Sequence, residues 1–129
     1  MEIPISLEIL LVEDNELHQE LIVRMLELVG YSADVVNSGE KALEAIQKKD
    51  YSLILMDLAM PRLDGFATTQ HIRNNDLPDD PYIIAVTALT MDNPREACRK
   101  AGMDDVLQKP VLIDDFRAAL ARFYTTQYS

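Results

Sequence analysis

The chain has 129 residues, 48% hydrophobic and 26% charged, which is enough to bury one ordinary core without disulfides or a structural metal. Twelve Lys and Arg against 22 Asp and Glu give a formal charge of −10, which disfavours direct binding to nucleic acid or to an anionic membrane. The one cysteine, Cys98, excludes an internal disulfide, and no apolar run approaches the roughly 18 residues of a membrane span, so we expect a cytoplasmic protein.

Strands and helices are predicted to alternate from residue 7 onward. The apolar runs 7–12 (LEILLV) and 52–56 (SLILM) are typical of strands buried on both faces, and a weaker strand, 31–36 (YSADVV), lies between them. Apolar residues at helical spacing predict a helix over 15–29, closed by Gly30. We expect its whole apolar stripe to face the sheet: Leu17, Leu21, Ile22, Met25, Leu26, Leu28 and Val29.

The remaining elements follow the same alternation. Ser38 can cap a second helix that reaches Lys49, and a third helix is predicted over about 65–75, followed by a proline-containing loop at 77–81. Then come a strand at 82–86, a helix capped by Asn93 and ending at Gly102, a short strand at 105–108 and a last helix at about 112–124.

Five strands alternating with five helices predict an α/β fold with a doubly wound parallel sheet. The strands 7–12, 52–56 and 82–86 are the most apolar, so they should be central. A flavodoxin-like strand order of 2-1-3-4-5 satisfies this requirement. Such a sheet has its ligand crevice where the direction of winding reverses, between the first and third strands.

Polar residues follow the ends of four predicted strands. Glu13 and Asp14 follow the first, Asp57 the third, Thr87 the fourth and Lys109 the fifth. Because the carboxyl ends of parallel strands lie at one edge, we expect these side chains to converge on the crevice. Asp57, which precedes a turn at Pro61, is expected to be presented to the crevice and not buried.

This residue set suits phosphoryl chemistry assisted by a metal. Three clustered carboxylates repel one another unless a cation lies among them, and Mg²⁺, with Mn²⁺ as a substitute, prefers such oxygen ligands. Thr87 offers a hydroxyl and Lys109 an ammonium to phosphoryl oxygens. A carboxylate can itself act as the nucleophile and form an acyl phosphate.

Four segments resemble the motifs of response-regulator receiver domains, and the resemblance extends from about residue 7 to 124. The segments are VEDN (12–15), MDLAMPRLDG (56–65), VTA (86–88) and KP (109–110). The resemblance implies that Asp57 is the phosphoacceptor. It also implies that Asp14, Asp57 and the backbone carbonyl of Ala59 hold Mg²⁺, with Glu13 acting through water. Thr87 and Lys109 would contact the phosphoryl group, and the Lys109–Pro110 bond would be cis.

The same resemblance implies the partners. A histidine kinase or histidine phosphotransfer protein would donate the phosphoryl group, and a downstream protein would bind the surface formed by the last two helices and the strand 105–108. The resemblance further implies a monomer or weak dimer that is not an enzyme beyond its own phosphorylation and slow dephosphorylation. We expect one receiver domain over 1–129 with no output domain. The loop 56–65 and the segment AGMDD (101–105) look most like receivers of hybrid histidine kinases, and a stand-alone regulator also fits.

Two residues depart from the family pattern. Val106 stands where receivers usually carry the Tyr or Phe that moves together with the threonine, so the switch role of this position is altered or lost. Ala59 offers no side chain to hold an attacking water, so the lifetime of the phosphorylated form does not carry over from the family.

Three other functions remain open. A phosphatase resembling haloacid dehalogenases needs a second acid two residues after the nucleophile, where this chain has Ala59. A flavodoxin-like protein needs a loop rich in Gly, Ser or Thr after the first strand, where this chain has acids. A degenerate receiver would act only as an interaction module. His18, His71 and Cys98 are interpreted as solvated or structural residues.

Overall fold

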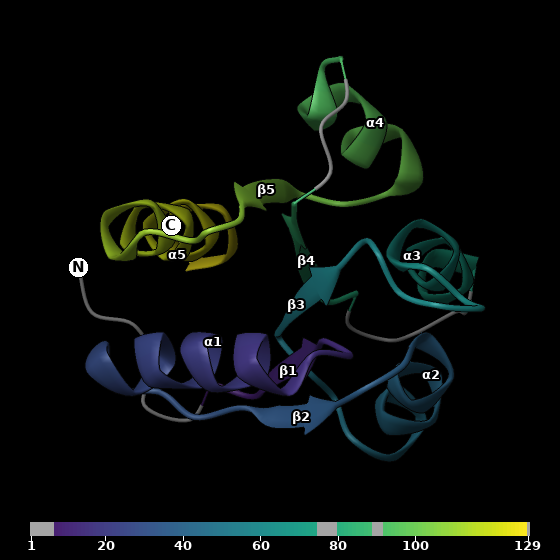
Figure 1. Ribbon diagram of the computed structural model, residues 1–129, viewed down its shortest axis with the longest axis horizontal. Coiled ribbons are helices and arrows are strands. Elements are labelled where there is room, and N and C mark those ends of the chain that lie inside the picture. Colours follow the sequence, from purple (N-terminus) through teal and green to yellow (C-terminus); the bar gives the residue numbers. More distant parts are fainter. Residues whose placement is uncertain (1–6, 75–79, 89–91, 129) are drawn as a thin grey trace.

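The computed structural model describes residues 7–74, 80–88 and 92–128, in which strands and helices alternate (Figure 1). The elements are β1 (Ile9–Val12), α1 (Glu16–Leu28), β2 (Asp34–Val36), α2 (Gly39–Lys48), β3 (Leu53–Asp57), α3 (Gly65–Asn74), β4 (Tyr82–Thr87), α4 (Pro94–Ala101), β5 (Asp105–Gln108) and α5 (Ile113–Tyr128). All strand pairs are parallel, in the order β2-β1-β3-β4-β5. The predicted fold and strand order are therefore confirmed; most of the predicted loop 77–81 lies outside the described residues.

Helices cover both faces of the sheet, with α1 and α5 on one face and α2, α3 and α4 on the other (Figure 1). Successive strand residues point to opposite faces, so Ile9 and Leu11 join one apolar cluster while Leu10 and Val12 join the other. β1, β3 and β4 are buried along their whole length, as their apolar sequences predict. These three central strands hold the crevice edge in place.

The inward face of α1 is narrower than predicted. Ile22 and Leu26 are buried, whereas the side chains of three other leucines are exposed: Leu17 (64%), Leu21 (49%) and Leu28 (71%). At 100° per residue these three positions fall within about 40° of one another, on a different side of the helix from Ile22 and Leu26. The prediction that the whole stripe faces the sheet is wrong, and the leucine stripe, defined as Leu17, Leu21 and Leu28, is left on the surface.

The last helix extends four residues beyond its predicted end because its final turn has aromatic partners. The ring centroids of Phe123 and Tyr128 lie 6.0 Å apart, and those of Tyr124 and Tyr128 lie 5.4 Å apart. The second strand is shorter than predicted and covers only Asp34–Val36.

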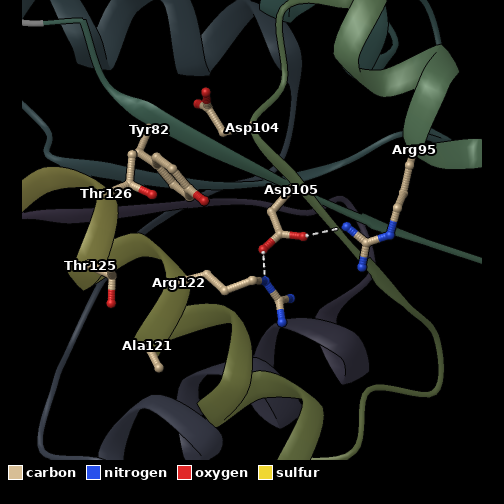
Figure 2. Close-up of a pocket in the computed structure, with 8 residues that line it drawn as sticks. All are labelled: Tyr82, Arg95, Asp104, Asp105, Ala121, Arg122, Thr125 and Thr126. Atoms are coloured by element: carbon tan, nitrogen blue, oxygen red, sulfur yellow. Dashed lines mark hydrogen bonds and ion pairs between the residues drawn. The ribbon is translucent and has the colours of Figure 1, made fainter.

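Asp105 ties α4 and α5 together through the first residue of β5. Its buried carboxylate accepts a hydrogen bond from Arg122 Nε at 2.6 Å and one from Arg95 Nη1 at 3.2 Å. Figure 2 shows the two arginines reaching the carboxylate from opposite sides of an open notch of about 470 Å³. Because Asp105 begins its strand, this notch lies at the opposite edge of the sheet from the strand ends.

Replacing Asp105 by Asn should lower the free energy of unfolding by about 1–3 kcal/mol, because a buried charged acceptor shared by two helices is lost. Unfolding in urea measures this difference. Asp50→Asn is the matched control, since Asp50 is exposed, and it should change the free energy by less than about 0.5 kcal/mol. Equal effects of the two substitutions would contradict the role given to Asp105.

Candidate functional site

The ends of the central strands bring acids from two strands together. Val12 of β1 pairs with Met56 of β3, so Glu13 and Asp14 follow directly beside Asp57, the last residue of β3. Glu13, Asp14 and Asp57 each offer one carboxylate oxygen, and these three atoms lie within 4.8 Å of one another. Glu13 and Asp57 are 1% and 3% exposed, whereas Asp14 is exposed. The prediction that Asp57 is presented and not buried is therefore wrong.

Asp57 is buried because the loop after β3 folds back over the strand end. Gly65 N donates to Leu58 O at 3.1 Å, and a Cβ at Gly65 would lie 2.8 Å from Leu58 Cα and would also clash with the Asp57 carbonyl oxygen. Ala59 N donates to Asp57 Oδ1 at 3.2 Å. This close backbone approach requires glycine at position 65 and fixes the Asp57 carboxylate.

Lys109, which follows the carboxyl end of β5, reaches the same two buried acids. Its Nζ donates to Glu13 Oε1 at 2.8 Å and lies 3.5 Å from Asp57 Oδ1. Its backbone N donates to Thr87 O at 2.8 Å, which ties it to the end of β4, where the Thr87 side chain is buried. The Lys109–Pro110 bond is cis, as the resemblance implies.

The two buried carboxyls divide one negative charge unequally. Burial, followed by the hydrogen bond and charge of Glu13, raises the pKa of Asp57 to about 7 against the opposing charge of Lys109. Burial also acts to raise the pKa of Glu13, but hydrogen bonds from Lys109, Asp57 and Asn15 N outweigh it and lower that pKa. In the absence of a cation, Asp57 therefore ionises near neutral pH, well above the pH at which Glu13 ionises.

The three carboxylates of Glu13, Asp14 and Asp57 suit a hard divalent cation. All three side chains offer oxygen, and the single ammonium of Lys109 does not balance three carboxylates. Mg²⁺ binds through one or two carboxylates while keeping several waters, which matches two buried acids beside an exposed one. The acidic cluster thus fits the metal that the sequence predicts. A role for the Ala59 carbonyl stays a prediction.

His18 lies at this site although the sequence indicated only a solvated or structural residue. Its Nδ1 lies 3.0 Å from Lys109 Nζ and 3.7 Å from Glu13 Oε1. Its place on the first turn of the helix that follows the acidic pair was the available signal, but the contact depends on Lys109, 91 residues away.

His71 is exposed, and Cys98 is a buried, packed residue. Val106 is half-buried and packs against the cluster beneath α2, α3 and α4.

An apolar groove of about 220 Å³ opens beside Lys109. It lies between α1 and the segment after β5, and its lining residues are His18, Leu21, Ile22, Met25, Lys109, Pro110 and Val111. Leu21 connects this groove to the leucine stripe of α1. Among the described helices, none is both long and apolar enough to cross a membrane.

Comparison with known proteins places these features in one family. The model of the response regulator receiver domain matches residues 9–121. Hybrid signal transduction histidine kinase B of Dictyostelium discoideum is 38% identical over 119 residues, which cover 84% of this chain and 6% of that protein. The chain spans 16% or less of the length of the first curated relatives that it matches.

Solved structures agree with this match. The receiver domain of sensor histidine kinase PA1611 from Pseudomonas aeruginosa, which has a magnesium ion coordinated in its active site cleft, is 39% identical with a TM-score of 0.81, and the alignment covers 91% of this chain and 96% of that one. The Saccharomyces cerevisiae Ssk1 receiver, solved with the histidine phosphotransfer protein Ypd1, has the same fold, with 23% identity, a TM-score of 0.83 and coverage of 95% and 92%.

The raised pKa of Asp57 predicts how stability changes with pH when no metal is bound. The folded-state value of about 7 exceeds the ordinary 3.8, so the stabilisation from protonated Asp57 is complete below pH 3.8 and is lost as the pH rises through 7. The Asp57→Asn variant has no ionisable group at this position, so it does not lose this stabilisation as the pH rises. Above pH 7 the variant should therefore be more stable than the wild type by about 1–3 kcal/mol.

Urea unfolding in a chelating buffer across this pH range measures the difference. Adding Mg²⁺ should restore stability to the wild type more than to the variant, because the variant has lost one carboxylate. Parallel stability profiles for the two proteins would contradict the pKa of Asp57.

Proposed function

The chain belongs to the family of response regulator receiver domains, and we propose that it accepts a phosphoryl group from a phosphohistidine protein on Asp57. The observation that carries the proposal is the buried Asp57 carboxylate, which lies beside Glu13 and within 3.5 Å of Lys109 Nζ. A nucleophile, a cation site and an ammonium thus meet at one strand edge. These are the groups that phosphoryl transfer needs.

In the proposed reaction an Asp57 carboxylate oxygen attacks the phosphorus of the donor, and the N–P bond of the phosphohistidine breaks. The electron pair of that bond returns to the imidazole nitrogen, and Asp57 becomes an aspartyl phosphate. Lys109 stabilises the phosphoryl oxygens as charge develops on them, and Thr87 donates its hydroxyl to one of them. The amide of Ala59, 3.2 Å from Asp57 Oδ1, orients the attacking carboxylate.

Glu13, Asp14, Asp57 and the Ala59 carbonyl would hold Mg²⁺ in this proposal. When bound, Mg²⁺ supplies positive charge that favours ionised Asp57 and shields the incoming phosphoryl oxygens. Lys109 alone leaves Asp57 with a pKa near 7, which supports the need for a cation.

The signal would leave through α4, β5 and α5. Thr87 ends β4, which is paired to β5 through Gln108, and Val106 lies two residues before Gln108 beside α4. Movement of Thr87 toward the phosphoryl group would therefore be transmitted to Val106. Because Val lacks the ring usual in the family, we propose that the α4-β5-α5 surface responds through packing alone and is recognised by a downstream protein.

The donor would dock on the groove and on Leu21, the residue through which the leucine stripe meets it. Leu21 is exposed and apolar, and the groove that it lines continues this surface to Lys109. A histidine kinase or a histidine phosphotransfer protein, of the kind seen with the Ssk1 receiver, could place a phosphohistidine over Asp57 from this side. An aspartyl phosphatase is less well supported, because Ala59 leaves it without a second acid.

Incubation with acetyl phosphate and Mg²⁺ should add the mass of one phosphoryl group to the wild-type chain, as measured by intact mass spectrometry. Asp57→Asn should show no adduct, because the amide cannot attack phosphorus. Asp50→Asn, which removes an exposed carboxylate, should be modified like the wild type. An adduct that persists in Asp57→Asn would exclude Asp57 as the acceptor. A wild type without any adduct would leave the interaction module as the function, and turnover of phosphate esters far beyond one equivalent would favour the phosphatase.

Leu21→Ser should slow phosphotransfer from a phosphohistidine protein by about tenfold, because a buried leucine contact contributes about 1.5–3 kcal/mol to docking. The donor is the member of a panel of histidine kinases and phosphotransfer proteins that modifies the wild type fastest. Leu28→Ser is the matched control, since it removes a leucine that is more exposed (71% against 49%), lies about 10 Å farther along α1 and does not line the groove.

Phosphorylation by acetyl phosphate should stay unchanged in both leucine variants, because a small donor needs no docking surface. If Leu21→Ser slows both donors equally, or if the two variants behave alike with the protein donor, the proposed docking surface is wrong.

A further inference from the structure

The Lys109 ammonium is surrounded by three acceptors, one of which comes from outside the acidic cluster. Glu13 Oε1 lies at 2.8 Å, His18 Nδ1 at 3.0 Å and Asp57 Oδ1 at 3.5 Å from Nζ. The Lys109 side chain is only 14% exposed. An ammonium carries three N–H donors and accepts nothing, so Lys109 must donate to His18, and His18 must offer an unprotonated Nδ1.

The position of His18 is set by the start of α1. Asn15 caps this helix, and its Oδ1 accepts the backbone N–H of His18 at 3.0 Å. Gln19 Nε2 donates to the Glu13 carbonyl at 2.6 Å, which ties the same turn back to the end of β1. His18 is therefore attached on a rigid element beside the acids, and its ring reaches Lys109 from the side of the groove.

A neutral acceptor does something for Lys109 that a carboxylate does not. Glu13 draws the ammonium toward itself by charge, and a cation bound among the acids competes with that attraction. The His18 nitrogen orients Nζ without cancelling its charge, so the full positive charge stays available to an anion on Asp57. Holding the long lysine side chain in one place costs rotamer entropy, and the hydrogen bond to His18 offsets part of that cost.

We propose that His18 is a positioning residue that holds the Lys109 ammonium toward Asp57 through a hydrogen bond accepted by Nδ1. The inference rests on the proposed role of Asp57 as phosphoacceptor. The proposal adds His18, which lies on α1 and lines the apolar groove, to the residues that orient the groups around Asp57.

Two substitutions of similar shape separate the hydrogen bond from packing. Asn places Oδ1 on Cγ, as His places Nδ1, so His18→Asn keeps an acceptor near Lys109. Leu has the same branching without an acceptor. With acetyl phosphate and saturating Mg²⁺, His18→Leu should be phosphorylated about three- to tenfold more slowly than the wild type, and His18→Asn within about twofold of it. Urea unfolding of both variants shows that they are folded.

A nuclear magnetic resonance measurement tests the contact without phosphorylation. Long-range ¹H–¹⁵N correlation of the metal-free wild type should show the His18 ring protonated at Nε2 and not at Nδ1, and the Lys109 ε-methylene resonance should shift in His18→Leu more than in His18→Asn. A proton on Nδ1, or equal phosphorylation rates in the wild type and His18→Leu, would overturn the role of His18 alone. A wild type that accepts no phosphoryl group would instead overturn the proposed function.

Discussion

Two buried carboxyls share one ammonium, and this imbalance of charge governs the site. Glu13 and Asp57 are almost fully buried, and Lys109 lies within 2.8 and 3.5 Å of them. One positive charge does not compensate both, so without a cation the pKa of Asp57 is raised to about 7. The chain thus gives up stability near neutral pH at a site whose three carboxylates suit a divalent ion, and such a loss of stability is common at functional sites.

The scaffold supplies the rigidity that this arrangement needs. β1 and β3 are buried along their whole length, and they end at the acids, so the acidic cluster is attached to two core strands. The loop after β3 is held over Asp57 by the close approach of Gly65. Lys109 is different, because its long side chain is placed only by its partners. The place of its Nζ therefore depends on the side chains that contact it, which include Glu13 and His18.

The apolar and polar surfaces lie at different places on the fold. The leucine stripe and its groove adjoin Lys109 on the α1 side. The Arg95–Asp105–Arg122 contacts lie at the other edge of the sheet, between α4 and α5, and Val106 follows Asp105 on the same strand. A contact that joins two helices through one buried carboxylate resists their separation, so it constrains any movement of α4 relative to α5.

The sequence by itself determined the alternation of elements, the central place of the apolar strands and which polar residues follow the strand ends, whereas it was consistent with the strand order without forcing it. These follow from local patterns, because a strand buried on both faces needs a continuous apolar run and a helix needs its cap. The sequence misjudged Asp57, the leucine stripe and His18. Each of these depends on which segments distant in the chain lie against it. Gly65 packs against the backbone of Asp57, and the sheet buries only part of the apolar face of α1. His18 contacts Lys109, which is 91 residues away in the sequence. Only the tertiary structure decided these points, because burial and hydrogen bonding at a site depend on neighbours that local periodicity does not contain.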